Sequence, residues 1–193
     1  MSAPSIPLPS PSQTVGPYLS IGMAWLNCPD LVDTGRPDAI TVTGRVLDAD
    51  GLPVPDAVLE LWQADQSGRF PTAGADPDTS PPGWSGWGRC PTDADGGYHF
   101  TTVVPGPVDD RQAPHADLSV FMRGLLQRLV TRIYFPPRAG VTGADRWLPP
   151  SDDPVVAGVP AERTGTLVAR PSADGYRFDV HLGGDAETVF FAW

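Results

Sequence analysis

Few side chains in this sequence could bind a metal ion, and most of them stand alone. His115 and Asp117 are separated by one residue, and two further carboxylates, Asp109 and Asp110, precede them by a few positions. A non-haem iron site of the facial-triad type needs two histidines and one carboxylate, and only one histidine is available here. A remnant loop with solvated aspartates is the simpler interpretation of this cluster.

The remaining metal-binding side chains are dispersed. Cys28 and Cys90 lie far apart and form no CxxC pair, which disfavours a disulfide framework or a zinc site. We therefore expect two reduced thiols. His99 and His181 fall on other expected strands and have no partner at ligand spacing.

Two charged residues interrupt otherwise apolar runs. Arg132 lies in the run VTRIYF, and Glu60 lies in the run VLELWQ. An unpaired charge in a protein interior is very unfavourable. We therefore predict that Arg132 pairs with a carboxylate such as Glu60 and that the pair has a structural role.

The elements that must position these residues are expected to be strands. The chain has 193 residues, and its 24 prolines and 21 glycines are spread between short apolar runs. This pattern is typical of an all-β domain with many turns. The run Ile40–Leu47 alternates as a half-buried strand does. Further strands are expected at 57–64, 98–103, 117–123, 129–135, 164–170, 176–182 and 187–192. The sequence predicts a β-sandwich of mixed strands.

Long loops and an N-terminal arm complete the expected architecture. The loops are expected at 66–89, 105–114 and 136–163. Loops of this length are uncommon in a compact domain unless they have a function. Several of the first residues are prolines, which resist helix. We expect an extended arm over 1–20, with a short turn or two at 19–26, and a sandwich domain over 21–193.

The composition disfavours several classes of partner. The formal net charge is −10, all 13 basic residues are arginine, and a nucleic-acid partner is therefore not expected. No run approaches the roughly 20 apolar residues of a membrane span. The N-terminus lacks a basic region followed by an apolar run, which is the mark of a secretion signal. The sequence predicts a cytoplasmic protein that binds neither nucleic acid nor membrane.

Several segments, in order along the chain, resemble the intradiol ring-cleavage dioxygenases. The segments are PSQTVGPY at 11–18, LELWQAD at 59–65, GR at 88–89 with TD at 92–93, GYHF at 97–100, PGP at 105–107, APH at 113–115, RIYF at 132–135 and TVFF at 188–191. Each segment is short, but the ordered series is specific. The resemblance implies a sandwich fold and the O₂-dependent cleavage of a catechol ring between its two hydroxyls.

In the catalytic chains of this family, two tyrosines and two histidines hold a ferric ion, and the histidines form a His-x-His on one strand. Three of these four positions differ here, because Phe70 and Val108 stand where tyrosines are expected and Asp117 replaces the second histidine. Only His115 remains. Shifting the loop alignment around Val108 by one or two residues brings aspartates rather than a tyrosine to that position. The resemblance implies that this chain does not bind the catalytic iron.

Some members of the family are built from two related chains, alpha and beta, with the active site at their contact. The beta chain carries Fe(III), and the alpha chain has lost it. This sequence resembles the alpha chain. That implies an alpha/beta hetero-oligomer with a homologous iron-bearing beta subunit. The complex would use O₂ to cleave protocatechuate to 3-carboxy-cis,cis-muconate. A dioxygenase-like module that has kept the shape and lost the chemistry is the alternative.

The resemblance implies no catalytic residue in this chain but three that contact substrate. Arg123, in a Phe-x-Arg-Gly turn, would bind the carboxylate of protocatechuate, since a planar guanidinium suits two-point contact. Thr14 and Tyr18, on the arm, would line the shared pocket. The alternatives are an ordinary exposed strand end for Arg123 and simple packing of the arm on its partner for Thr14 and Tyr18.

Overall fold

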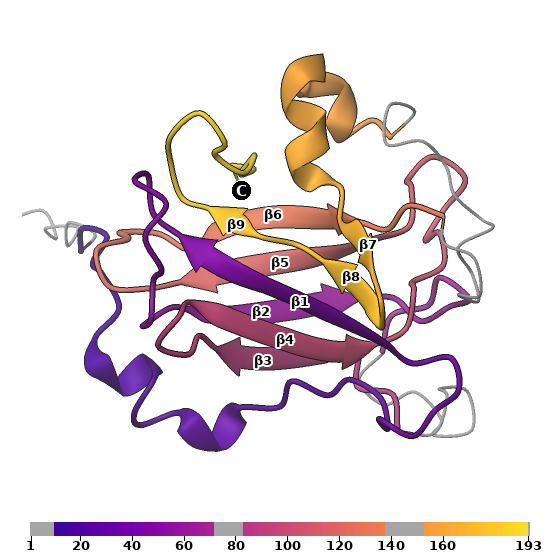
Figure 1. Ribbon diagram of the computed structural model, residues 1–193, viewed down its shortest axis with the longest axis horizontal. Helices are drawn as coiled ribbons and strands as arrows, with labels where there is room; N and C mark the ends of the chain where they lie inside the picture. Colours follow the sequence, from indigo (N-terminus) through magenta and orange to yellow (C-terminus); the bar gives the residue numbers. More distant parts are fainter. Residues whose placement is uncertain (1–9, 72–82, 138–152, 193) are drawn as a thin grey trace, which may run out of the picture.

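The computed structural model of the protein describes residues 10–71, 83–137 and 153–192. Two β-sheets pack face to face in it (Figure 1). One sheet has the order β4-β1-β8-β7, with β9 also paired to β1, and the other has the order β3-β2-β5-β6. Strand β1 pairs antiparallel with β4 and parallel with β8, so the strands are mixed. The predicted β-sandwich is confirmed.

The strands are β1 (Ile40–Leu47), β2 (Val58–Gln63), β3 (Trp87–Pro91), β4 (Gly97–Thr102), β5 (His115–Phe121), β6 (Leu129–Tyr134), β7 (Arg170–Ser172), β8 (Gly175–Arg177) and β9 (Val180–His181). The helices in the described ranges are short 3-10 turns: η1 (Pro17–Leu19), η2 (Ala24–Leu26), η5 (Val156–Gly158) and η6 (Ala161–Leu167). None of the helices in these ranges is long and apolar enough to cross a membrane. Strands β1, β2, β4, β5 and β6 lie within two residues of their expected positions.

The core lies between the sheets and is filled by side chains from the inner faces of their longer strands. Its buried members include Val42, Val46, Leu59, Leu61, Phe100, Leu118 and Ile133. Burying each such side chain contributes about 1.5–3 kcal/mol. The opposite face of the β3-β2-β5-β6 sheet carries His115, Asp117 and Arg132 together with apolar residues such as Trp62.

Two of the expected strands are wrong. Residues 164–170 lie mostly within the 3-10 helix η6. The hydroxyls of Thr164 and Thr166 donate to the carbonyls of Ala161 and Arg163, both at 2.8 Å, and this local hydrogen bonding competes with a strand. Residues 187–192 form no regular strand, although the Phe191 N–H donates to the Val130 carbonyl at the edge of the sheet.

The expected strand at 176–182 is interrupted rather than absent. Strands β8 and β9 lie beside β1 in one register, Thr43 opposite Arg177 and Val46 opposite Val180. Between them, the Arg45 N–H donates to the Asp179 carboxylate at 3.0 Å instead of to a backbone carbonyl. A side chain thus replaces one rung of the ladder.

Strand β3 falls at the end of the expected loop 66–89 and was missed. Its sequence, WGRCP, contains a glycine and a proline, both of which usually interrupt strands. Gly88 is needed for close packing, because a Cβ there would lie 2.4 Å from Cδ1 of Leu31. The glycine therefore marks a close approach within the sandwich and not a turn.

The N-terminal segment runs along one side of the sandwich. Short turns expected at 19–26 are present as η1 and η2, which begin and end close to those bounds. After them, Cys28 and Arg89 exchange backbone hydrogen bonds at 3.0 and 3.1 Å, and the Leu31 N–H donates to the Thr101 carbonyl at 2.8 Å. The segment therefore joins the edge of β3 to that of β4. The boundary between an arm over 1–20 and a domain over 21–193 stays a prediction.

Candidate functional site

The two ligand positions of the His-x-His segment lie at the start of β5, and Arg123, which is expected to contact substrate, lies beyond its end. His115 and Asp117 are the first and third residues of the strand, whereas Arg123 follows its last residue by two positions. A strand rises about 3.3 Å per residue, so His115 and Arg123 are separated by roughly 25 Å. The sequence-predicted residues thus form two separate groups.

Neither expected tyrosine position offers a metal ligand. Phe70 stacks on Trp62 with ring centroids 5.6 Å apart and planes 3° from parallel. Val108 is partly exposed, in a loop held against the 65–70 turn by the hydrogen bond from the Gly106 N–H to the Asp65 carbonyl. A phenyl ring and an isopropyl group have no lone pair to donate to an iron.

His115 is buried and held by the backbone. Its Nδ1 lies 2.7 Å from the Ala113 carbonyl, and because a carbonyl only accepts, Nδ1 carries the proton. Burial, and then the positive charge of Arg132, lower the pKa of the imidazole below its usual value. Its Nε2 lies 4.0 Å from the Asp117 carboxylate. His115 is therefore a neutral ring with one tautomer fixed.

The guanidinium of Arg132 lies beside Asp117, the residue that replaces the second histidine. The Nε of Arg132 is 3.3 Å from the Asp117 carboxylate, and its Nη1 is 3.6 Å from that of Asp153. Its Nη2 donates to Gln112 Oε1 at 3.1 Å. Asp153 is fully buried and also accepts from the Tyr134 hydroxyl at 3.1 Å. Two carboxylates thus neutralise one buried cation.

The expected pairing of Arg132 with Glu60 is wrong, although the expectation of a paired Arg132 holds. The register of β5 and β6 places Asp117 directly opposite Arg132. Glu60 instead lies opposite Arg89 on β3, with Arg89 Nη1 and Glu60 Oε1 2.7 Å apart. Arg89 lies within the segment expected as a loop, so the sequence gives no sign that it faces Glu60.

These residues do not fit a ferric ion. Two of the four ligand positions lack a donor atom, and the carboxylate of Asp117 already faces a fixed cation that would repel a trivalent one. Asp109, a further acidic candidate, accepts from the backbone N–H groups of Arg111 and Gln112 at 2.9 and 2.7 Å. Across the described ranges, no group of three His, Cys, Asp or Glu side chains is arranged to hold a metal ion.

Arg123 lies beyond the other end of β5 and faces Asp56. The Nε of Arg123 donates to Asp56 Oδ2, while 74% of the arginine side chain is exposed. Its Nη1 and Nη2 make no hydrogen bond within the described chain. This leaves a fork of two donors, already oriented by Asp56, that matches a carboxylate in two-point contact.

The N-terminal arm is tied to the same turn. The Gly124 N–H donates to Thr14 Oγ1 at 2.7 Å. Gly124 has a φ of +94°, a conformation that favours glycine and lets the chain turn directly after Arg123. A cavity of about 230 Å³ is lined by Arg123, Asp56 and N-terminal residues that include Gly16, Pro17 and Ile21. The structure thus brings Thr14 and Arg123 together.

Tyr18 is close to this cavity but points away from it. It does not line the cavity, and 78% of it is exposed. Its ring lies over Gly22, where a Cβ would be 2.7 Å from Tyr18 Cδ1. Within this chain, then, Tyr18 packs on its own turn and presents its phenol outward.

Asp56 is not marked by any motif in the sequence, and its place follows from strand register. Strands β2 and β5 pair Val58 with Phe121, and extending that antiparallel register by two residues brings Asp56 opposite Arg123. No pattern in the sequence gives this register, because it depends on which strands pair. Arg89 was missed for the same reason, and it donates from Nη2 to the Leu19 carbonyl at 2.7 Å, which anchors the arm.

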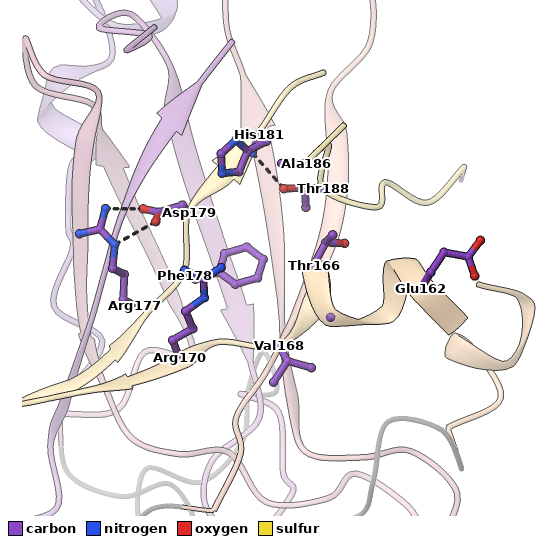
Figure 2. Close-up of a pocket in the computed structure, with 11 residues that line it drawn as sticks. Glu162, Thr166, Val168, Arg170, Arg177, Phe178, Asp179, His181, Ala186 and Thr188 are labelled. Atoms are coloured by element: carbon purple, nitrogen blue, oxygen red, sulfur yellow. Dashed lines mark hydrogen bonds and ion pairs between the residues drawn. The ribbon is translucent and has the colours of Figure 1, made fainter. Parts of the chain in front are cut away.

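A larger cavity, of about 370 Å³, lies elsewhere, between η6, β8, β9 and the C-terminal segment (Figure 2). Figure 2 shows Arg177 and Asp179 paired at its wall, with Arg177 Nη2 and Asp179 Oδ1 2.8 Å apart. The His181 N–H donates to the Thr188 hydroxyl at 2.9 Å. None of the sequence-predicted site residues lines this cavity.

Both the sandwich fold and the altered ligand positions indicate that the chain is related to the dioxygenases. The family described as Dioxygenase matches residues 25–184, and the chain belongs to this family of ring-cleaving dioxygenases. The alpha chain of protocatechuate 3,4-dioxygenase from Burkholderia cepacia is 40% identical to it, over 94% of this chain and 96% of that one.

Two further comparisons bear on the fold and on the partner. The beta chain of protocatechuate 3,4-dioxygenase from the same organism is 37% identical, over 79% of this chain and 68% of that one. The dioxygenase domain of a dioxygenase carbohydrate-binding protein fusion from Streptomyces sp. SirexAA-E superposes with a TM-score of 0.54, at 22% identity, covering 95% of this chain and 96% of that one. This last likeness concerns the fold alone.

Proposed function

We propose that this chain is the alpha subunit of a protocatechuate 3,4-dioxygenase. Its partner is a homologous beta chain that holds Fe(III), which supplies the chemistry for O₂-dependent ring cleavage when bound. The observation that carries the proposal is the position of Arg123, beyond the opposite end of β5 from His115 and Asp117. An arginine about 25 Å from its own chain's altered ligand positions cannot contact a substrate held there, so a substrate-binding role for Arg123 requires a site on another chain.

In the complex, this chain binds and orients substrate and holds no reacting group. Nη1 and Nη2 of Arg123 donate to the carboxylate of protocatechuate, and Asp56 holds the guanidinium in place by accepting from its Nε. Thr14 positions the arm against the Arg123–Gly124 turn through its hydrogen bond to Gly124. Tyr18 presents its hydroxyl toward the partner's side of the pocket. The two free thiols, Cys28 and Cys90, fit a cytoplasmic location.

The first test compares the chain alone with the chain co-expressed with the iron-bearing chain from the same genome. We expect iron and protocatechuate-dependent O₂ uptake only in the complex. Stoichiometric iron and turnover by this chain alone would overturn the proposal. A chain that forms no complex and supports no activity would make it a non-catalytic dioxygenase-like module.

A variant at Arg123 tests the assigned role directly. In the complex, Arg123→Ala should raise KM for protocatechuate about 10-fold or more with iron content unchanged, because a hydrogen-bonded charge contributes about 1.5–3 kcal/mol. Arg123→Lys should recover part of the loss, since it restores the charge without the two-point geometry. An unchanged KM would return Arg123 to an ordinary exposed strand end.

A further inference from the structure

Exposed apolar side chains are concentrated in one short segment of the chain. Nine large apolar side chains are exposed among the described residues, and four of them lie between residues 18 and 25. These are Tyr18, Ile21, Met23 and Trp25, exposed by 78, 76, 37 and 79%. Single exposed apolar residues are ordinary, whereas a cluster marks an interaction site. We call these four side chains the turn face.

The backbone that carries the turn face is fixed. The Ile21 N–H donates to the Pro17 carbonyl and the Met23 N–H to the Tyr18 carbonyl, both at 3.0 Å. The buried Arg89, paired with Glu60, holds the Leu19 carbonyl at 2.7 Å. Figure 1 shows this indigo segment as two short turns beside the sandwich. A fixed backbone with exposed aromatic side chains loses little conformational entropy on binding, which favours docking.

The turn face continues into the cavity that contains Arg123. Ile21 belongs to both, because it is exposed and also lines that cavity with Asp56 and Arg123. A chain that brings a substrate carboxylate to Arg123 must therefore approach Ile21 as well. The surface next to Ile21 is then covered by the same chain.

We propose that the turn face is a docking site for the homologous iron-bearing chain, with Ile21 and Trp25 as its anchors. This inference rests on the proposed function. Tryptophan and tyrosine are enriched among the residues that carry most of the energy of protein interfaces. The partner surface that fits is apolar, with a hydrogen-bond acceptor for the indole N–H of Trp25 and a donor or acceptor for the phenol of Tyr18.

The test uses the full chain co-expressed with an affinity-tagged iron-bearing chain from the same genome. The variants are Trp25→Glu and Ile21→Glu, and the matched control is Leu52→Glu, which places the same charge at a leucine of 59% exposure outside the turn face. The dissociation constant of each complex is measured by titration, together with iron content. Thermal unfolding of each variant chain alone checks that it folds.

We expect Trp25→Glu and Ile21→Glu each to raise the dissociation constant about 30-fold or more, the level of an interface hot spot, and Leu52→Glu to change it little. Their unfolding temperatures should match that of the unaltered chain, because the altered side chains face solvent. If the unaltered chain associates and both variants associate equally well, the docking site is wrong and the proposed function stands. If the unaltered chain itself does not associate, both are overturned.

Discussion

Asp56 and Arg123 face each other just beyond the paired ends of β2 and β5, in the register that sets Val58 opposite Phe121. The Asp56 carboxylate accepts from Nε of the guanidinium, which leaves Nη1 and Nη2 to donate to a second anion. Asp56 therefore has two opposing effects on a bound carboxylate: it orients the donor fork, and its negative charge repels the substrate.

Asp56→Asn separates these two effects. The amide oxygen still accepts from Nε, so the fork stays oriented, while the repulsion is removed. Two unit charges at about 6 Å in a water-like medium interact by about 0.7 kcal/mol, so KM for protocatechuate should fall about three-fold with kcat unchanged. Steady-state kinetics of the complex at low ionic strength measure this. A KM that rises would show that orientation requires the charge itself.

Thr14→Val should loosen the arm from the Arg123 turn. The valine keeps the shape of the side chain but cannot accept from the Gly124 N–H, and a hydrogen bond of this kind contributes about 0.5–1.5 kcal/mol. We expect KM to rise about three- to ten-fold in the complex, with iron content unchanged. Thr14→Ser keeps the acceptor and should behave as the unaltered chain. Equal kinetics for both variants would remove Thr14 from the site.

Arg132→Leu should destabilise the fold severely. It leaves the carboxylates of Asp117 and Asp153 without their cation, and removing one partner of a buried pair costs about 3–5 kcal/mol. Arg177→Leu breaks an exposed pair with Asp179 and should cost about 1 kcal/mol or less. Urea unfolding of both variant chains gives the comparison. Similar costs would mean that the Arg132 cluster is more solvated than its burial indicates.

The sequence predicts the sandwich because short apolar runs, of which Ile40–Leu47 alternates clearly, are separated by prolines and glycines. It also predicts the loss of iron ligands, because Phe70 and Val108 are recognised from motif order alone. Which charges meet depends on strand register, and register depends on packing across the whole sheet. For this reason Arg132 was assigned to Glu60, whereas its partners are Asp117, opposite it on β5, and Asp153 from a distant segment.

The stability of the isolated chain should fall as the pH falls below about 6.5, the ordinary pKa of histidine. Burial and the charge of Arg132 lower the pKa of His115 in the folded chain, so the unfolded chain takes up the proton first. Stability from this group is therefore fully present above the ordinary pKa and is lost progressively toward the lower folded value. His115→Gln should flatten the pH dependence of the free energy of unfolding in urea between about pH 7.5 and about pH 5. These values span about one pH unit or more on either side of that pKa.

Asp117, Asp153 and Tyr134 also surround this ring, and burial raises the pKa of the Tyr134 phenol, so that it stays neutral throughout this range. A variant with His115→Gln that retains the full slope would assign the pH dependence to other groups.

Arg89→Lys should release the arm while retaining the charge on β3. One ammonium cannot reach both Glu60 and the Leu19 carbonyl in the geometry that two guanidinium nitrogens achieve at 2.7 Å each. Since the carboxylate is the stronger partner, the Leu19 contact is the one that is lost. We expect faster amide exchange over residues 17–26, weaker binding of the iron-bearing chain and a higher KM for protocatechuate. Exchange in β2 and β5 should be unaltered. If the turns exchange as slowly as in the unaltered chain, their own hydrogen bonds suffice, and Arg89 serves only to neutralise Glu60.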